Sequence, residues 1–116
     1  TGETPGAFCD GRYNININDK KIAGTAQKWR PIKKGVFAVL AHVALMVEMD
    51  IDKGVEAVNT FQQICGLGKP SLVESHITIN DVLKREGIAP LVGKETEASK
   101  MALYQAYSKV FAPFLT

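Results

Sequence analysis

The sequence predicts an α+β domain in which helices pack on a mainly antiparallel sheet, and three observations predict it. Apolar side chains recur with a period of two in the first half of the chain and at helical spacing in the second half. The strand signals also precede the helix signals, which is typical of α+β proteins. The chain has 116 residues, 46% of them hydrophobic and 22% charged, so we expect a single domain with its own core.

A β-hairpin is expected near the N-terminus. Tyr13, Ile15 and Ile17 alternate with asparagines, which predicts a strand with one apolar and one polar face. Residues 18–20, Asn-Asp-Lys, predict a tight turn because Asn and Asp tolerate left-handed backbone. Residues 21–29 are then expected to return as the second strand.

The next segment is predicted to be a third strand. Pro31 and Gly35 indicate a break over 30–35, and the following residues, 36–49, are almost uniformly apolar. Such a run is typical of a central strand covered on both faces or of a buried helix. Its β-branched and aromatic content favours the covered strand.

Helical signals occupy the rest of the chain. Apolar residues at helical spacing predict a helix over 52–64. Thr78 followed by Asp81 resembles a capping box and predicts a short helix that stops at Gly87. A final amphipathic helix is expected over 95–111, with its aromatic residues in the core.

These elements divide the chain into three parts of one domain. We expect an N-terminal loop over 1–12, a three-stranded sheet portion over 13–49 and a helical portion over 50–116. The N-terminus lacks an initiator Met and any signal-peptide pattern, so the chain is expected to be a processed product or an excised piece.

Charge and cysteine usage exclude several function classes. A formal net charge of +2 is too small to indicate nucleic acid or a membrane surface as partner. The apolar run over 36–47 is shorter than the roughly 20 residues that span a bilayer. Cys9 and Cys65 share no metal-ligand spacing with each other or with His42 and His76, so no metal site is expected. Free cysteines favour a reducing compartment, here the cytoplasm.

Two side chains could carry chemistry. Lys21 opens a strand after a turn and is followed by small residues, so it could point into a cleft and bind a carboxylate, a phosphate or an oxyanion. A solvated hairpin lysine is the alternative. Cys9 lies in a glycine-flanked loop, where Arg12 would favour its thiolate and Asp10 would oppose it. It is a candidate nucleophile or an ordinary thiol.

Other candidates have plainer interpretations. His42 is expected to be a core histidine, Cys65 a core residue and His76 a local hydrogen bonder. A basic stretch over 28–34 contains no acidic residue, and it is either a solvated loop or a docking patch for an acidic protein. Its cations are Lys28, Arg30, Lys33 and Lys34.

The residues around Lys21 resemble a known family. The segment 11–17, Gly-Arg-Tyr-Asn-Ile-Asn-Ile, followed by 20–27, Lys-Lys-Ile-Ala-Gly-Thr-Ala-Gln, resembles the lipoate–protein ligase and octanoyltransferase superfamily. The apolar segment 39–46 with its histidine and the segment 75–83, Ser-His-Ile-Thr-Ile-Asn-Asp-Val-Leu, are also similar to it. The resemblance implies the fold shared by biotin and lipoate ligases and class II synthetases.

The resemblance also implies roles for particular residues. Lys21 matches the family's catalytic lysine, which contacts the acyl carbonyl and the adenylate phosphate. Cys9 lies in a segment similar to the cysteine motif of one transferase branch, except that Asp10 stands where that branch has Pro. The motif residues expected to bind substrate are Asn14, Gly24, Thr25 and Ala26.

Three functions follow from this resemblance. A ligase would attach a lipoyl or octanoyl group to a carrier lysine through an acyl-adenylate, with ATP and Mg²⁺. A transferase would move the group between carrier proteins through a thioester on Cys9, without a cofactor. Because the chain resembles only the later half of the family's domain, a partial domain, it could also be a non-catalytic fragment that needs a complementary N-terminal chain. The carriers implied are lipoyl domains of 2-oxoacid dehydrogenases and the glycine cleavage H protein.

Overall fold

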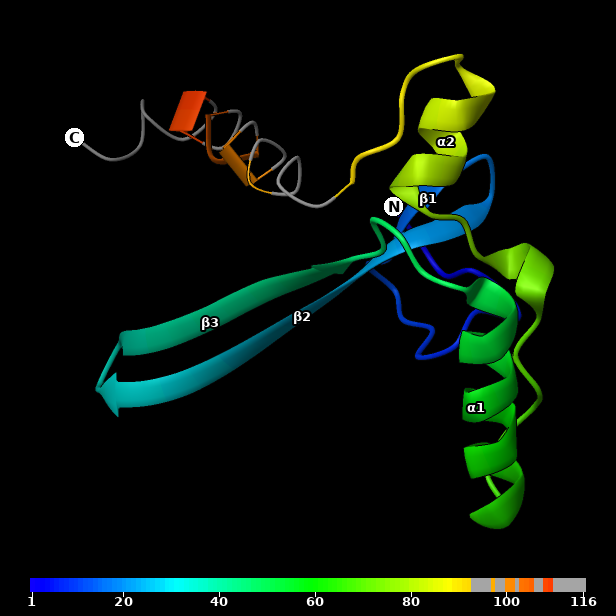
Figure 1. The fold of residues 1–116 in the computed structure, drawn as a ribbon. Coiled ribbons are helices and arrows are strands. Elements are labelled where there is room, and N and C mark those ends of the chain that lie inside the picture. The colour runs from blue at the N-terminus through cyan, green and yellow to red at the C-terminus, as the bar shows by residue number, and fades with distance from the viewer. Residues whose placement is uncertain (93–96, 98–99, 102, 106–107, 110–116) are drawn as a thin grey trace.

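The computed structural model describes residues 1–92, 97, 100, 101, 103–105, 108 and 109. The elements follow in the order β1 (Ile15–Ile17), β2 (Lys20–Lys33), β3 (Val36–Leu45), α1 (Ile51–Ile64), the 3-10 helix η1 (Val73–Ser75) and α2 (Ile79–Arg85) (Figure 1). The strands form one antiparallel sheet in the order β1-β2-β3. The predicted α+β class is therefore confirmed for the described residues.

The first hairpin forms as predicted. Asn18 and Asp19 have φ values of 49° and 59°, the left-handed backbone that a two-residue hairpin loop requires. The turn places Ile17 opposite Lys20. A register irregularity between Ile15 and Asn16 then brings Ile15 opposite Ala23.

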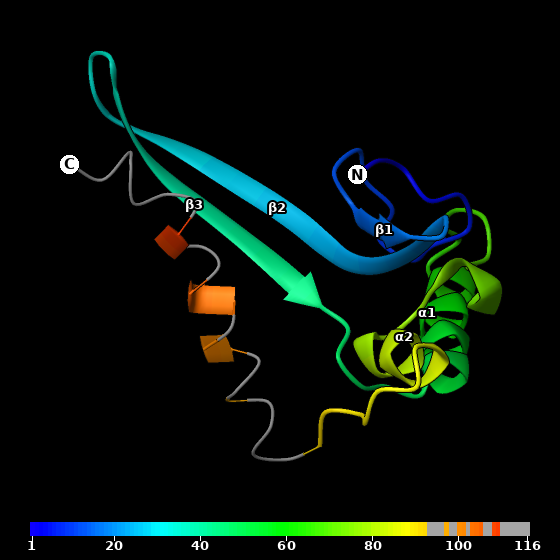
Figure 2. The same ribbon diagram turned by 90° about the horizontal axis from the view of Figure 1, so that it is seen from above.

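The second strand is longer than predicted, because the break expected over 30–35 is confined to the turn at its end. β2 continues through Pro31, which pairs with Phe37, and the register shifts between Pro31 and Lys33. A proline is tolerated here because β2 has no neighbour on its other side at this point, so no ladder hydrogen bond is lost. Figure 2 shows the resulting β2–β3 hairpin extending away from α1 and α2.

The prediction that the third strand is covered on both faces is wrong. The first nine residues of β3 are exposed, with Phe37 at 52% and Leu40 at 62%. We call residues 27–41, the outer part of the β2–β3 hairpin, the arm. His42, expected in the core, is exposed at the inner end of β3. A continuous apolar run predicts burial only when other elements supply the cover.

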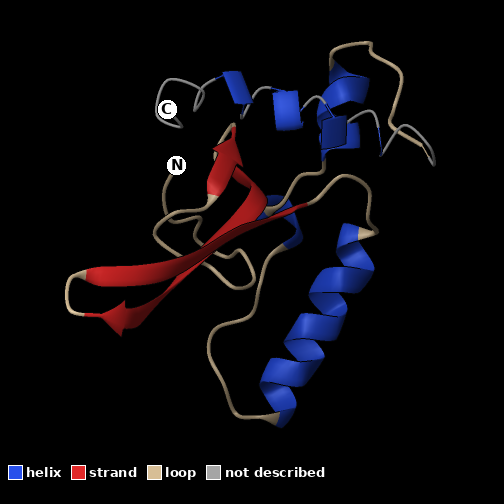
Figure 3. Ribbon diagram, turned by 90° about the vertical axis from the view of Figure 1, so that its left-hand side faces the viewer, coloured by secondary structure: helices blue, strands red, loops and turns tan. Residues whose placement is uncertain are grey.

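The core lies where the sheet meets the helices. Ile22, Ala23 and Ile77 are buried together, and the residues packed against them are Ile17, Leu45, Ile79 and Val82. Figure 3 shows the short β1 strand and the base of the hairpin lying beside the helical segments. The segment after η1 joins the sheet directly, because Lys21 forms a parallel bridge with His76 and the Ile77 N–H donates to the Lys21 carbonyl at 3.0 Å.

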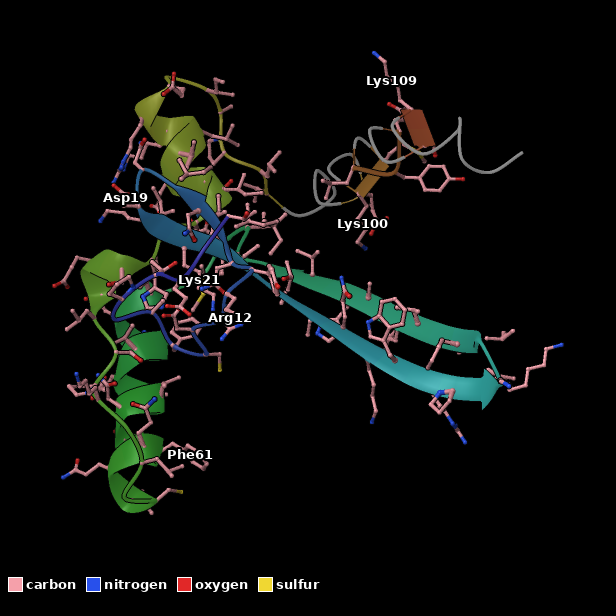
Figure 4. All side chains as sticks on the ribbon, turned by 180° about the vertical axis from the view of Figure 1, so that it is seen from behind. Arg12, Asp19, Lys21, Phe61, Lys100 and Lys109 are labelled. Carbon is pink, nitrogen blue, oxygen red and sulfur yellow. The ribbon has the colours of Figure 1, made fainter. Side chains whose placement is uncertain are left out.

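Helix α1 begins at an Asp50 cap, whose carboxylate accepts from the Lys53 N–H at 3.1 Å. Only the N-terminal part of its apolar stripe is covered: Val55 is 4% exposed, whereas Phe61 is 62% exposed. Figure 4 shows Phe61 near the far end of α1. Cys65, expected to be a core residue, is exposed just beyond the helix, so that prediction is wrong.

Helix α2 has the predicted capping box. The Asp81 carboxylate accepts from the Thr78 N–H at 2.9 Å, and the Thr78 hydroxyl accepts from the Asp81 N–H at 3.1 Å. The Thr78 hydroxyl also donates to the Asp81 carboxylate at 2.7 Å, and this bond, together with the one from the Thr78 N–H, lowers the pKa of Asp81. The side chain of Asn80 in α2 holds the segment that follows the helix. It donates to the Leu91 carbonyl at 2.9 Å and accepts from the Leu91 N–H at 2.7 Å.

The predicted final helix, 95–111, falls largely on residues outside the described ones. Within it, Tyr104 is 67% exposed, so the prediction of a core position is wrong for this aromatic residue. Of the helices that the structure describes, none has the length and apolar character needed to cross a bilayer. The three-part division at residues 12 and 49 stays a prediction.

Candidate functional site

Lys21 is buried at the centre of the molecule. It is the second residue of β2, pairs with Asn16 on one side and His76 on the other, and is 3% exposed. Figure 4 shows it where β2 passes the N-terminal loop. The ammonium group donates to the Phe8 carbonyl at 2.9 Å and to the Cys9 carbonyl at 2.7 Å. The alternative of a solvated hairpin lysine does not hold.

The Lys21 ammonium keeps a donor for a ligand. It has three N–H groups, and two are used by the loop carbonyls. Burial lowers the pKa of Lys21, while the nearby Cys9 and Asp10 act in the opposite direction. The side chain lies beside Gly24, where an added Cβ would be 3.7 Å from Nζ. The third donor can therefore serve a group that enters beside Gly24.

His76 holds the loop that carries these carbonyls. Its ring stacks on Phe8 with centroids 4.2 Å apart, and its Nε2 accepts from the Phe8 N–H at 3.0 Å. Its Nδ1 lies 2.8 Å from the Leu72 carbonyl. A carbonyl only accepts and an amide N–H only donates, so the ring must be neutral with its proton on Nδ1. Burial, the largest effect, lowers the pKa of His76.

Close packing fixes the N-terminal loop against η1. Gly6 has φ of 82°, and a Cβ there would lie 2.8 Å from both a Leu72 methyl carbon and the Ser75 hydroxyl. The Gly6 carbonyl accepts from the Leu72 N–H at 2.7 Å, and the Ser75 hydroxyl donates to the Pro5 carbonyl at 2.7 Å. Asp10 accepts from the Thr4 N–H at 2.8 Å. The loop is therefore anchored on both sides of Phe8.

Cys9 has a strained backbone and an exposed side chain. Its φ of 49° lies in the left-handed region, which is uncommon for a residue with a Cβ. The residue is exposed, although its carbonyl is turned towards the Lys21 ammonium. Such backbone is often associated with functional sites. This geometry places the thiol and the buried ammonium around one space.

That space is an open cavity of about 470 Å³. Its volume is within the range of small-molecule sites, about 300–1,000 Å³. Its polar side chains are Lys21, Cys9, Thr25 and His42, and the rest of the lining is apolar. The lining residues are Phe8, Cys9, Lys21, Gly24, Thr25, Ala26, His42, Ala44, Leu45, Met46 and Met49.

Most of the sequence-predicted site residues meet at this cavity. Lys21, Cys9, Gly24, Thr25 and Ala26 all line it. Their roles in substrate binding or catalysis stay predictions.

Asn14 is placed elsewhere. It is 2% exposed, its backbone pairs with Gly2, and its amide donates to Asp10. It therefore braces the loop rather than lining the cavity.

Sequence reasoning missed Phe8 as part of the site and assigned His76 only a local hydrogen bond. The bond from Phe8 to His76 joins residues 68 positions apart, so no local pattern could reveal it. Met46 and Met49, which follow β3, were also missed because they lie in what was taken as one covered strand. A signal was present in the similar segment 75–83, which contains His76.

The described residues do not by themselves fit a magnesium nucleotide. The lining offers phosphates a single ammonium, Lys21, and two of its donors are occupied. The described lining also contains no carboxylate, the group through which proteins usually hold the Mg²⁺ of a nucleotide. The apolar lining suits an acyl chain better than a triphosphate.

The basic stretch over 28–34 is exposed along the arm, which is compatible with both a solvated loop and a docking patch. All four of its cationic residues are exposed: Lys28, Arg30, Lys33 and Lys34. The arm also exposes Trp29 at 61% and Phe37 at 52%, whose rings meet edge to face at 6.1 Å.

Known proteins resemble part of this chain. An octanoyl-[GcvH]:protein N-octanoyltransferase from Kyrpidia tusciae is 36% identical over 67 residues, which cover 53% of this chain and 23% of that protein. The chain is thus related in sequence to an octanoyltransferase.

A second relative carries no described activity. It is an uncharacterized protein from Cupriavidus necator, 30% identical over 95 residues, which cover 72% of this chain and 38% of that protein. The chain thus spans less than two fifths of either relative. No protein-family model and no solved structure matches the chain.

Proposed function

We propose that this chain carries the acyl-transfer residues of an enzyme that attaches an octanoyl or lipoyl group to a lysine of a carrier protein. One observation carries the proposal: the buried Lys21 ammonium retains an unused donor at the wall of an apolar cavity that also holds Cys9. The relationship to an octanoyltransferase supports it. That relative's name contains GcvH, so the glycine cleavage H protein is the first carrier to test.

The cavity suits both the acyl chain and the carbonyl group of such a substrate. The acyl chain would lie against Leu45, Met46 and Met49, and its carbonyl would face Lys21. When the acceptor amine attacks, the carbonyl oxygen becomes an oxyanion, and a donor already in position lowers the barrier. The two loop carbonyls hold that donor in place before the reaction begins.

Activation of the acyl group could follow the ligase route. In that route ATP and Mg²⁺ would generate an acyl-adenylate, and Lys21 would bind its acyl carbonyl. Because the described residues do not fit the nucleotide, its binding groups would have to come from elsewhere in a longer protein. We also propose that the whole protein has the fold of biotin and lipoate ligases.

A second route has a specific observation in its favour, because Cys9 lines the cavity beside Lys21. The Cys9 thiolate would attack the acyl carbonyl of the donor, and the donor amine would leave with a proton. The acceptor lysine would then attack the thioester carbonyl and release the thiolate. Each step passes through an oxyanion that Lys21 can stabilise.

The first experiment separates the two routes. The chain is incubated with an octanoylated H protein and with an unmodified acceptor carrier, and products are identified by mass spectrometry. A hydroxylamine-labile octanoyl adduct on Cys9, absent from Cys9→Ser and present in the exposed-cysteine control Cys65→Ser, supports the thioester. Full transfer by Cys9→Ser eliminates it.

A second experiment tests the ligase route and the need for further chain. Octanoate, ATP and Mg²⁺ replace the acylated donor. Octanoylation retained by Cys9→Ser and lost in Lys21→Met supports the acyl-adenylate. If this chain is inactive with either donor but becomes active when the preceding region of the full-length protein is added, the fragment alternative holds. Inactivity of the full-length protein with both donors contradicts the proposed function.

A further inference from the structure

We propose that His76 is a positioning residue that clamps the Phe8–Cys9 segment onto Lys21 and so fixes the geometry of the acyl-transfer site. It would act through Phe8 and would not itself touch the substrate. The inference rests on the proposed function for its catalytic consequence. Its structural part concerns only this chain and can be tested separately.

The clamp has three contacts on a buried ring. His76 is 3% exposed, and its ring both stacks on Phe8 and accepts the Phe8 N–H. On its far side, the ring donates from Nδ1 to the Leu72 carbonyl. This second bond fixes the tautomer, because it places the proton on Nδ1 and leaves Nε2 free to accept.

The same peptide segment is held from two directions. His76 binds the N–H of Phe8, while Lys21 binds the carbonyls of Phe8 and Cys9. The Lys21 ammonium also lies 5.8 Å from the centre of the Phe8 ring. These opposed contacts over-determine the left-handed backbone at Cys9, which would otherwise relax.

The strand pairing makes the two clamping residues neighbours. Lys21 and His76 form a parallel bridge, so β2 and the segment after η1 set the spacing between ammonium and imidazole. Rigid elements position reactive groups more accurately than loops do. His76 is fixed by its pairing with β2 and in turn binds Phe8, so the sheet positions the loop that carries Cys9.

Protonation of the ring would release the clamp, since a doubly protonated imidazole cannot accept the Phe8 N–H. The charged group acting on the ring is the Lys21 ammonium of β2, which disfavours a second positive charge nearby. On the N-terminal loop, the Cys9 thiol and the Asp10 carboxylate act on Lys21 in turn. Acid should thus loosen the loop without unfolding the core.

The structural test uses nuclear magnetic resonance on the whole chain. Long-range ¹H–¹⁵N spectra at neutral pH should show His76 as a neutral ring protonated at Nδ1, with the exposed His42 as internal reference. Hydrogen exchange of the Phe8 amide should be about tenfold faster in His76→Phe, which keeps a ring for stacking and loses both hydrogen bonds. A ring protonated at Nε2, or an unchanged Phe8 exchange rate, overturns the clamp.

The functional test uses the most active form of the protein, this chain or the full-length protein. His76→Phe should lower kcat for carrier octanoylation by 10-fold or more and leave KM within twofold. His76→Gln offers an amide oxygen near the Nε2 position and cannot titrate, so it should restore most of the rate and lose the acidic limb of the pH profile. Transfer by His76→Phe at the wild-type rate overturns the positioning role.

The two tests fail separately. If the spectra show the clamp but no form of the protein transfers an acyl group, the proposed function is wrong and the structural inference stands. If transfer occurs and the Phe8 amide exchanges equally fast with and without the imidazole, the function stands and the clamp is wrong. If His76→Phe does not fold, the tautomer of the wild-type ring still tests the clamp, and the pH profile of His76→Gln still tests the positioning role.

Discussion

The two ends of β2 have opposite environments although they belong to one strand. Near its start, Lys21, Ile22 and Ala23 are 3%, 4% and 0% exposed, whereas Trp29 in the arm is 61% exposed. At Lys21 the strand has partners on both sides, Asn16 and His76, but in the arm it pairs only with β3. Burial in this molecule is thus decided by neighbouring elements, and hydrophobicity alone does not predict it.

The largest contrast should come from deleting apolar side chains. Ile77→Ala removes a buried core side chain at the base of the sheet and should lower the free energy of unfolding by about 2–5 kcal/mol. Leu40→Ala in the arm should change it by about 0.5 kcal/mol or less, since that residue is 62% exposed. Urea unfolding followed by circular dichroism measures both, and equal losses would contradict the comparison.

Removing a charge should affect activity at the buried start of β2 and not in an exposed loop. In the active form of the protein, Lys21→Met should lower carrier octanoylation by about 10²–10³-fold, because it removes the oxyanion donor. Lys69→Met, which alters an exposed loop lysine distant in sequence from the cavity lining, is the matched control and should act within twofold of wild type. Normal transfer by Lys21→Met would show that Lys21 is not the oxyanion donor.

Two glycines with similar backbone conformation allow the packing of the N-terminal loop to be compared with that of the hairpin tip. Gly6 and Gly35 have φ values of 82° and 76°, but only Gly6 has atoms within 3 Å of an added Cβ. Gly35→Ala, at the tip of the hairpin, should cost about 1–2 kcal/mol for left-handed backbone. Gly6→Ala should add about 1–3 kcal/mol of overpacking to that cost. Chemical denaturation of both variants gives the difference, and a smaller loss at Gly6 would show that η1 can move away.

The smallest effect should be a pH dependence of stability. The pKa of His76 is lowered in the folded protein from its usual value of about 6.5, so the unfolded chain binds the extra proton first. Stability should therefore fall as pH drops below about 6.5, and this fall should be absent from His76→Gln. Asp81 acts separately: its stabilisation is lost only below its usual range, near pH 4. Thermal melting between pH 5 and 8 provides the measurement.

Local chemistry predicted much of the fold. The Asn18–Asp19 turn and the Thr78–Asp81 capping box formed as expected, because each depends on residues a few positions apart. The apolar run over 36–49 was misread, since its cover would have to come from other elements. Pro31 was taken as a break because the sequence does not show which strand edge is free.

The candidate site was predictable only in part. Five of its residues lie in two short motifs, so their types and spacing pointed to Lys21 and Cys9. The contacts that orient them come from His76 and Leu72, which approach the loop only after the chain has crossed the sheet and α1. Long-range hydrogen bonds of this kind leave no periodic trace in a sequence.

The composition of the hairpin has a consequence for how copies of the chain meet. Among the described residues, neither edge of the arm pairs with a further strand, so its backbone groups could pair with a second hairpin beside the exposed aromatic residues. Yet the arm contains three lysines and one arginine and no carboxylate. Two such arms would repel each other on approach, and positive charge along exposed strand edges disfavours edge-to-edge pairing.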